Sequence, residues 1–217
     1  MNEPQRPVKV AINVMRARLT VVAFNLAIVT VQLGVLPKLP GAVELPDSGV
    51  SLHLGTDVTL LLGGALSVIA LVCFIVSSAF DEQGTCNHWT LLAGDLFMYL
   101  GLAQSISGFF SPFAELLSQE NTALGAQASG FEAVRLAVVI AGGAAWLMAT
   151  YLGPIVSLLR SPYGRLRTSV LAAAYVALLL GIAFTNSQAA LLQDARAGVS
   201  SDPGKTFAGE LFKPLRW

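Results

Sequence analysis

The sequence predicts an all-α integral membrane protein, a bundle of about five transmembrane helices with short loops. Of its 217 residues, 54% are hydrophobic and 12% are charged, about half the charge of a typical soluble domain. The mean hydropathy is +0.67, and the apolar residues gather in stretches that can cross a hydrocarbon core, which takes roughly 20 helical residues. The 13 basic residues form no concentrated basic face, so we expect no nucleic-acid partner.

The predicted transmembrane domain is a single unit over residues 19–186. Its five helices are expected at about 19–36, 57–80, 89–110, 133–159 and 168–186. The first apolar stretch is longer than the core of an ordinary signal peptide, so we interpret it as a retained signal anchor. Residues 1–18 form a cytoplasmic amphipathic segment, which either lies along the lipid headgroups or simply begins the first helix.

The segments outside the helices are short. The first outer loop carries Pro37, Pro40 and Pro46 and is expected to be extended or turned. Residues 111–131 are expected to join the third and fourth helices as a short amphipathic turn on the membrane surface. The tail, residues 187–217, is predicted to be non-cytoplasmic. Its apolar residues should dock on membrane, on a partner or on the bundle itself; they are Phe207, Leu211, Phe212, Leu215 and Trp217.

The orientation follows from the positive residues near the helix ends, because Lys and Arg are retained in the cytoplasm. Outer loops hold only Lys38 and Arg135. The opposite side holds Arg6, Lys9, Arg16, Arg18, Arg160, Arg165 and Arg167. The predicted outer tail adds Arg196, Lys205, Lys213 and Arg216, but a long tail has little influence on topology. We therefore predict a multi-pass protein with its N-terminus inside and its C-terminus outside, in a bacterial inner membrane or an equivalent membrane.

Small residues recur at every fourth position in the last two predicted helices. In lipid, helices associate by close approach across small residues rather than by the hydrophobic effect. The two rows therefore predict either a tight antiparallel hairpin across the short loop 161–164 or a face for a second copy or a partner subunit. The rows are Ala133, Ala137, Ala141, Ala145, Ala149, Gly153 and Ser157, then Ser169, Ala173, Ala177, Gly181 and Thr185.

One acidic residue, Asp95, stands inside the apolar stretch GDLFMYLG. An ionised carboxylate is costly there, so it should find a partner, face water or stay protonated. Tyr99 lies one turn further on, and Asn25 and Gln32 share a stripe of the first helix; these are the candidate partners. We prefer a packing role over a proton or cation site, because a transport pathway normally shows several convergent polar groups and this acid stands alone.

The sequence favours neither metal nor hydrolytic chemistry. His53 and His88 lie on opposite sides of the membrane, and Cys86 beside His88 falls short of the three or four spaced ligands of a zinc site. We therefore predict no metal site. Neither histidine has an evident nucleophile and orienting acid, so an intramembrane enzyme is the third choice among the possible functions.

The leading functional expectation is a structural or assembly subunit of a larger membrane complex, acting through helix, lipid and tail contacts. Its expected partners are membrane lipids and other membrane subunits or a second copy of the chain. The sequence specifies no cofactor, although lipid or pigment between the helices is compatible with such a subunit. The alternative is a small proton-coupled or cation-selective transporter that uses Asp95.

Overall fold

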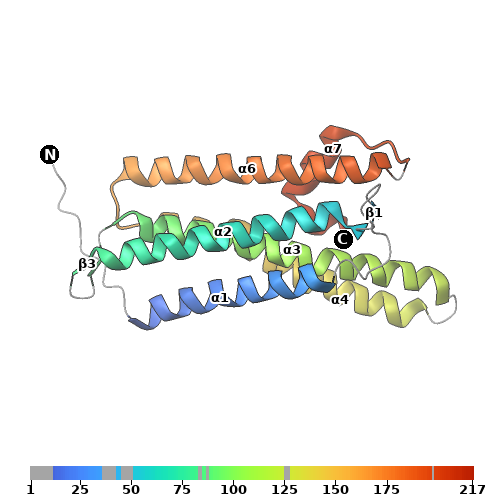
Figure 1. Ribbon diagram of the computed structural model, residues 1–217, viewed down its shortest axis with the longest axis horizontal. Coiled ribbons are helices and arrows are strands. Elements are labelled where there is room, and N and C mark those ends of the chain that lie inside the picture. The colour runs from blue at the N-terminus through green and yellow to red at the C-terminus, as the bar shows by residue number, and fades with distance from the viewer. Residues whose placement is uncertain are drawn as a thin grey trace.

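The structure, a computed structural model, describes residues 12–35, 43–44, 51–82, 85–86, 88–124, 128–196 and 198–217. Its long helices lie side by side, and successive ones run in opposite directions (Figure 1). They are α1 (Ile12–Val35), α2 (Leu54–Ala79), α3 (Thr90–Leu124), α4 (Ala128–Leu147) and α6 (Arg165–Arg196). Two antiparallel pairs of two-residue strands complete the described loops: β1 (Val43–Glu44) with β2 (Ser51–Leu52), and β3 (Asp81–Glu82) with β4 (Thr85–Cys86).

The helical membrane fold predicted from the sequence is confirmed in its coarse features. Within the part of the chain that the structure describes, four helical segments are long and apolar enough to cross a membrane: Val14–Val35, Leu54–Ala79, Glu132–Leu159 and Arg165–Arg196. The fifth predicted span, α3, is not among these four. Polar side chains such as Asp95 and Gln104 lower its hydropathy, and both of them are buried inside the bundle.

α3 packs against α2 through glycines spaced seven residues apart. A Cβ atom added to any of them would come within 2.4 to 2.8 Å of an α2 side chain, so nothing larger fits without displacing a neighbour. The facing pairs are Gly94 with Phe74, Gly101 with Ser67 and Gly108 with Leu60. Because the α2 residues repeat with the same spacing of seven, the two antiparallel helices mesh along one seam, as coiled-coil helices do.

The fourth predicted span is one bent helix in three parts: α4, a π-helical turn η3 (Met148–Leu152) and α5 (Gly153–Leu159). Pro154 explains the irregular turn, because a proline has no N–H to donate to the carbonyl one turn before it. That carbonyl belongs to Thr150, and the Tyr175 hydroxyl of α6 donates to it at 2.5 Å. A side chain from another helix thus replaces the missing backbone donor, as is typical where proline interrupts a transmembrane helix.

Several of the predicted helices were too short. α3 continues to Leu124, where a surface turn over residues 111–131 was expected, because Pro112 inside it removes one hydrogen bond without ending the helix. α6 continues to Arg196, ten residues into the predicted tail. α1 is unbroken from Ile12, whereas the earlier part of the predicted amphipathic segment, residues 1–11, lies outside the described residues.

The expected hairpin between the two small-residue rows is wrong. α4 and α5 pack mainly on α3, and α6 packs on α2 and on the tail helix α7 (Pro203–Leu211). The rows diverge because α3 supplies a better partner for the inner half of the first row. Ala149 is buried beside Ala103 and Trp146, and the Tyr99 ring fills the space over Gly153.

The outer parts of both rows face away from the bundle. On α4, Ala137 and Ala141 are exposed and Ala145 is half-buried. On α6, Ala173, Ala177 and Gly181 are all exposed, and a Cβ added to Gly181 would meet nothing within 4 Å. Both rows therefore leave a smooth surface on the outside of the molecule.

Candidate functional site

Asp95 does not stand alone, because Arg18 of α1 forms a bidentate ion pair with it. The Arg18 Nε donates to Asp95 Oδ1 at 2.5 Å, and the second guanidinium nitrogen donates to Oδ2 at 2.7 Å. The side chains are 19% and 11% exposed, respectively. Arg18 also lies over the Phe74 ring, with 5.9 Å between the guanidinium carbon and the ring centroid. A paired guanidinium is a strong, geometrically specific partner for a carboxylate.

The partners proposed for Asp95 from the sequence lie elsewhere. Tyr99 packs its ring on Gly153, and Asn25 donates to the Ser67 hydroxyl of α2. Gln32 is fourteen residues beyond Arg18 on α1, about 21 Å along a helix axis, so it cannot approach Asp95. Arg18 was considered for orientation only, because it lies just before the first predicted span, where a positive residue is ordinary.

A cavity of about 290 Å³ opens beside this ion pair. We call it the Arg18 cavity; it is lined by Arg18 and Asp95, by Ser157 and Arg160 of the α5 end, and by apolar residues of α3. Tyr163 closes one side, and its hydroxyl donates to the backbone oxygen of His88 at 2.7 Å. The ion pair thus borders a cavity of mixed polar and apolar lining at the helix ends.

A second group of polar side chains lies deeper in the bundle. The Asn186 amide of α6 donates to the Gln104 side chain of α3 at 3.0 Å, and the Thr59 hydroxyl of α2 lies 3.4 Å from the Asn186 oxygen. All three side chains are buried. Three helices therefore share one hydrogen-bond network, which sequence reasoning missed because each residue stands alone in its own helix.

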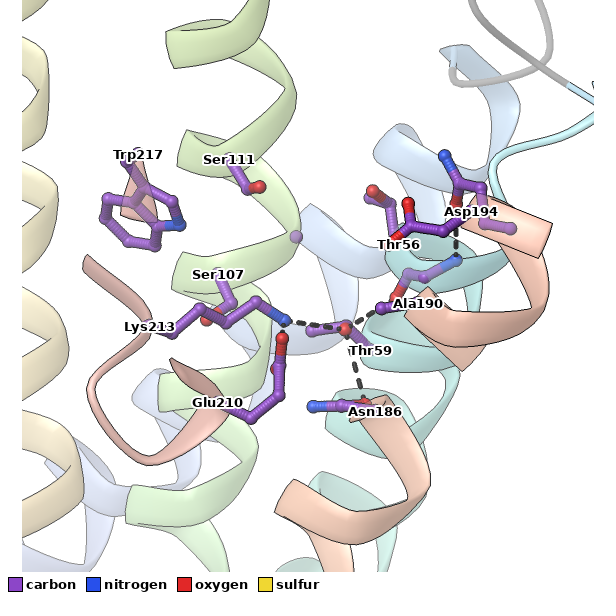
Figure 2. A pocket seen from close by; sticks show the side chains of 13 residues that line it. Thr56, Thr59, Ser107, Ser111, Asn186, Ala190, Asp194, Glu210, Lys213 and Trp217 are labelled. Atoms are coloured by element: carbon purple, nitrogen blue, oxygen red, sulfur yellow. Dashed lines mark hydrogen bonds and ion pairs between the residues drawn. The ribbon is translucent and has the colours of Figure 1, made fainter. Parts of the chain in front are cut away.

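This network ends in a polar cavity of about 300 Å³ between α2, α3, α6 and the tail, which we call the tail-side cavity. Figure 2 shows the Lys213 ammonium between Glu210 and Thr59. It lies 3.0 Å from Glu210 Oε2 and donates to Thr59 Oγ1 at 3.2 Å. The Lys213 and Glu210 side chains are 14% and 6% exposed, so this is a largely buried ion pair.

The tail forms the wall of this cavity because it docks on its own bundle. The Trp217 ring stacks on Phe110 of α3 with 6.1 Å between centroids, and Gly142 of α4 leaves the space that both rings fill. The Tyr151 hydroxyl donates to the backbone oxygen of Leu211 at 2.5 Å. Of the predicted docking residues, Phe207, Leu211 and Trp217 are half-buried, whereas Phe212 and Leu215 are exposed.

Comparison with known protein families, with curated proteins and with solved structures gave no match. Within the described residues, no group of three or more His, Cys, Asp or Glu side chains is arranged to hold a metal ion.

Proposed function

We propose that the chain crosses the membrane five times, with α3 as the fifth crossing. Its 35 residues span about 50 Å at 1.5 Å per residue, more than the roughly 30 Å of a hydrocarbon core. α3 contacts α1, α2, α4 and α6, so other helices enclose its polar face and lipid does not meet it. An enclosed crossing can carry polar residues that a lipid-facing helix cannot.

The alternation of the helices supports the proposed orientation, with the N-terminus inside and the C-terminus outside. The start of α1, the β3–β4 pair and the α5–α6 loop lie at one end of the bundle, and the tail lies at the other (Figure 1). Arg16, Arg18, Arg160, Arg165 and Arg167 belong to the first end, which the positive-inside rule makes cytoplasmic. A reporter fused after Trp217 should be active only on the non-cytoplasmic side; cytoplasmic activity would overturn the fifth crossing.

Within the membrane, we propose that the protein works by contact, as a structural or assembly subunit of a larger complex. The observation that carries this proposal is the outward row of Ala173, Ala177 and Gly181 on α6. A helix surface of small residues lets another backbone approach closely, and such approach is the main source of attraction between helices in lipid. The row is therefore a suitable contact face for another membrane subunit or for a second copy of the chain.

Ala177→Leu tests this contact role, because it adds bulk to an exposed face of α6. The thermal stability of the single chain should be unchanged, while recovery of the complex or oligomer in mild detergent should fall strongly. Val176→Phe, which adds bulk to the neighbouring exposed face, is the matched control. A wild-type protein that purifies at native abundance as a monodisperse monomer without any partner would contradict the proposal.

A second candidate, a small proton-coupled or cation-selective transporter, is favoured by buried polar pairs between the helices of the bundle. The absence of such groups argued against transport when the sequence was considered alone. The pairs Arg18–Asp95, Asn25–Ser67 and Gln104–Asn186 join α3 or α2 to their neighbours at successive depths. Convergent polar groups of this kind are typical of ion pathways.

Flux through proteoliposomes separates the two candidates. If Asp95 carries ions or protons, Asp95→Asn should abolish flux while the double variant Arg18→Gln/Asp95→Asn, which removes both charges, stays folded and equally inactive. Wild-type vesicles without flux under a proton or cation gradient, or undiminished flux in Asp95→Asn vesicles, would eliminate the transport candidate and leave the contact role.

A further inference from the structure

The tail-side cavity has the properties of a ligand site, and neither proposed function uses it. Its volume of about 300 Å³ is at the lower end of the range of small-molecule sites. Four parts of the chain, α2, α3, α6 and the tail, build its walls (Figure 2). A site assembled from so many elements is held in place by the whole fold rather than by one loop.

The charges of the cavity favour a cationic ligand. Glu210 and Lys213 neutralise each other at 3.0 Å, and the third ionisable residue in the wall is Asp194. One oxygen of Asp194, Oδ2, accepts a hydrogen bond from Ser201 at 2.5 Å, which leaves Oδ1 for a ligand. The cavity therefore carries a net negative charge, and a carboxylate in a partly buried site pairs best with a group that is both charged and a donor.

Two groups in the wall are hydrogen-bond donors without an acceptor. The Ser107 hydroxyl and the Trp217 indole nitrogen are buried and have no hydrogen-bond partner among the described residues. Lys213 has used only two of its three N–H donors, toward Glu210 and Thr59. A buried donor without a partner is costly, so the favoured ligand also supplies an acceptor.

We propose that the tail-side cavity binds a small molecule carrying a primary ammonium group and, a few bonds away, an oxygen that accepts hydrogen bonds. The ammonium faces Asp194, and the oxygen faces the donors Ser107, Lys213 and Trp217. Two sources share this chemistry: the headgroup of phosphatidylethanolamine, and free solutes such as amino alcohols. The proposal holds whether the protein acts by contact or by transport.

The test uses the purified full chain and four probes, two soluble amines and two lipids. In detergent, the affinities of ethanolamine and ethylamine are compared, because ethylamine has the ammonium without the acceptor oxygen. In nanodiscs, native mass spectrometry compares retention of phosphatidylethanolamine with that of phosphatidylcholine, whose trimethylammonium group cannot donate hydrogen bonds. Ethanolamine should bind at least several-fold more tightly than ethylamine if the source is a free solute. Selective retention of phosphatidylethanolamine alone would identify the lipid headgroup.

Two conservative variants then locate the site. Asp194→Asn should weaken binding of the preferred probe about tenfold, because it removes the charge and keeps the shape. Trp217→Phe should weaken it roughly three- to tenfold while preserving the stacking on Phe110; it should not lower the melting temperature of the ligand-free protein, since the lost donor had no partner. Asp81→Asn removes a carboxylate in β3, at the opposite end of the bundle from the cavity (Figure 1); it is the control and should change nothing.

Failure of all the probes to bind would overturn the proposal. So would equal affinity for ethanolamine and ethylamine with no preference between the two lipids, or binding that neither Asp194→Asn nor Trp217→Phe weakens. Because the Trp217→Phe variant is expected to fold as well as wild type, a loss of binding there cannot be attributed to misfolding.

Discussion

The hydrogen bond from Tyr175 to the Thr150 carbonyl gives the sharpest stability prediction. Tyr175→Phe removes only the hydroxyl, and the ring keeps its packing in the core with Leu96 and Leu100. The residues Tyr175 and Thr150 are 7% and 1% exposed, so water does not replace the lost donor. The variant leaves a buried carbonyl without its Tyr175 donor, opposite a proline that has no N–H to offer.

The magnitude follows from two bounds. A buried group left unpaired costs roughly 1–3 kcal/mol, whereas hydrogen bonds between transmembrane helices average about 0.6 kcal/mol and reach about 1.7 kcal/mol. We expect about 1–2 kcal/mol here, because the 2.5 Å contact is short and its acceptor lacks the usual helical donor. The measurement is equilibrium unfolding in mixed micelles of a denaturing and a mild detergent.

A double-mutant cycle tests the physical reason as well as the size. Pro154→Ala restores a backbone N–H facing the Thr150 carbonyl, so Tyr175→Phe should cost at least about 0.5 kcal/mol less in that background. Tyr99→Phe is the matched control, since its hydroxyl makes no hydrogen bond within the described chain, and it should cost little. An equal cost of Tyr175→Phe with and without Pro154 would refute the explanation, even if the single variant is destabilised.

Three further predictions concern the packing and the ion pair. Asp95→Asn should destabilise the fold by about 1–3 kcal/mol, because it leaves Arg18 without its carboxylate partner. The double variant Arg18→Met/Asp95→Leu should recover most of this lost stability. Equal stability of wild type and Asp95→Asn would show that the ion pair contributes nothing to the stability of the fold. Gly108→Ala should destabilise the fold by about 1–3 kcal/mol in melting experiments, because its Cβ would lie 2.4 Å from a carbon of the buried Leu60. Gly181→Ala, in contrast, should be neutral or stabilising by up to about 1 kcal/mol. The reverse order of the two stabilities would contradict the arrangement of α3 and α6. Trp217→Ala should detach the tail and make it sensitive to limited proteolysis, whereas Trp217→Phe should protect it as well as wild type does; equal protection of both variants would show that the ring does not anchor the tail.

Only part of the candidate site could be predicted from single residues of the sequence. Asp95 was recognised as the exceptional residue of its helix, because an acid in an apolar stretch is visible in one dimension. Its partner was not, since Arg18 is 77 residues away and resembles an ordinary positive residue at a membrane boundary. The tail-side cavity was missed entirely, because Thr59, Asn186 and Lys213 have nothing in common until α2, α6 and the tail bring them together.

The helix seam, in contrast, was available in the sequence. Gly94, Gly101 and Gly108 repeat every seven residues, and so do Leu60, Ser67 and Phe74 in the neighbouring helix. The alanine rows were more conspicuous, and their spacing of four suggested a hairpin that the structure does not contain. A row of small residues shows that something can approach closely, but it does not identify what approaches.

By itself, the sequence determined that the chain is a helical membrane protein, because apolar length and low charge act locally and each helix satisfies its own backbone in lipid. The approximate positions of the long helices follow from the same local rule. Only the tertiary structure decided which helix lies at the centre, which acid meets which base, and which row of alanines is buried or exposed. Those outcomes depend on competition between alternative helix faces for the same neighbour, and that competition is settled by shape complementarity among residues distant in the chain.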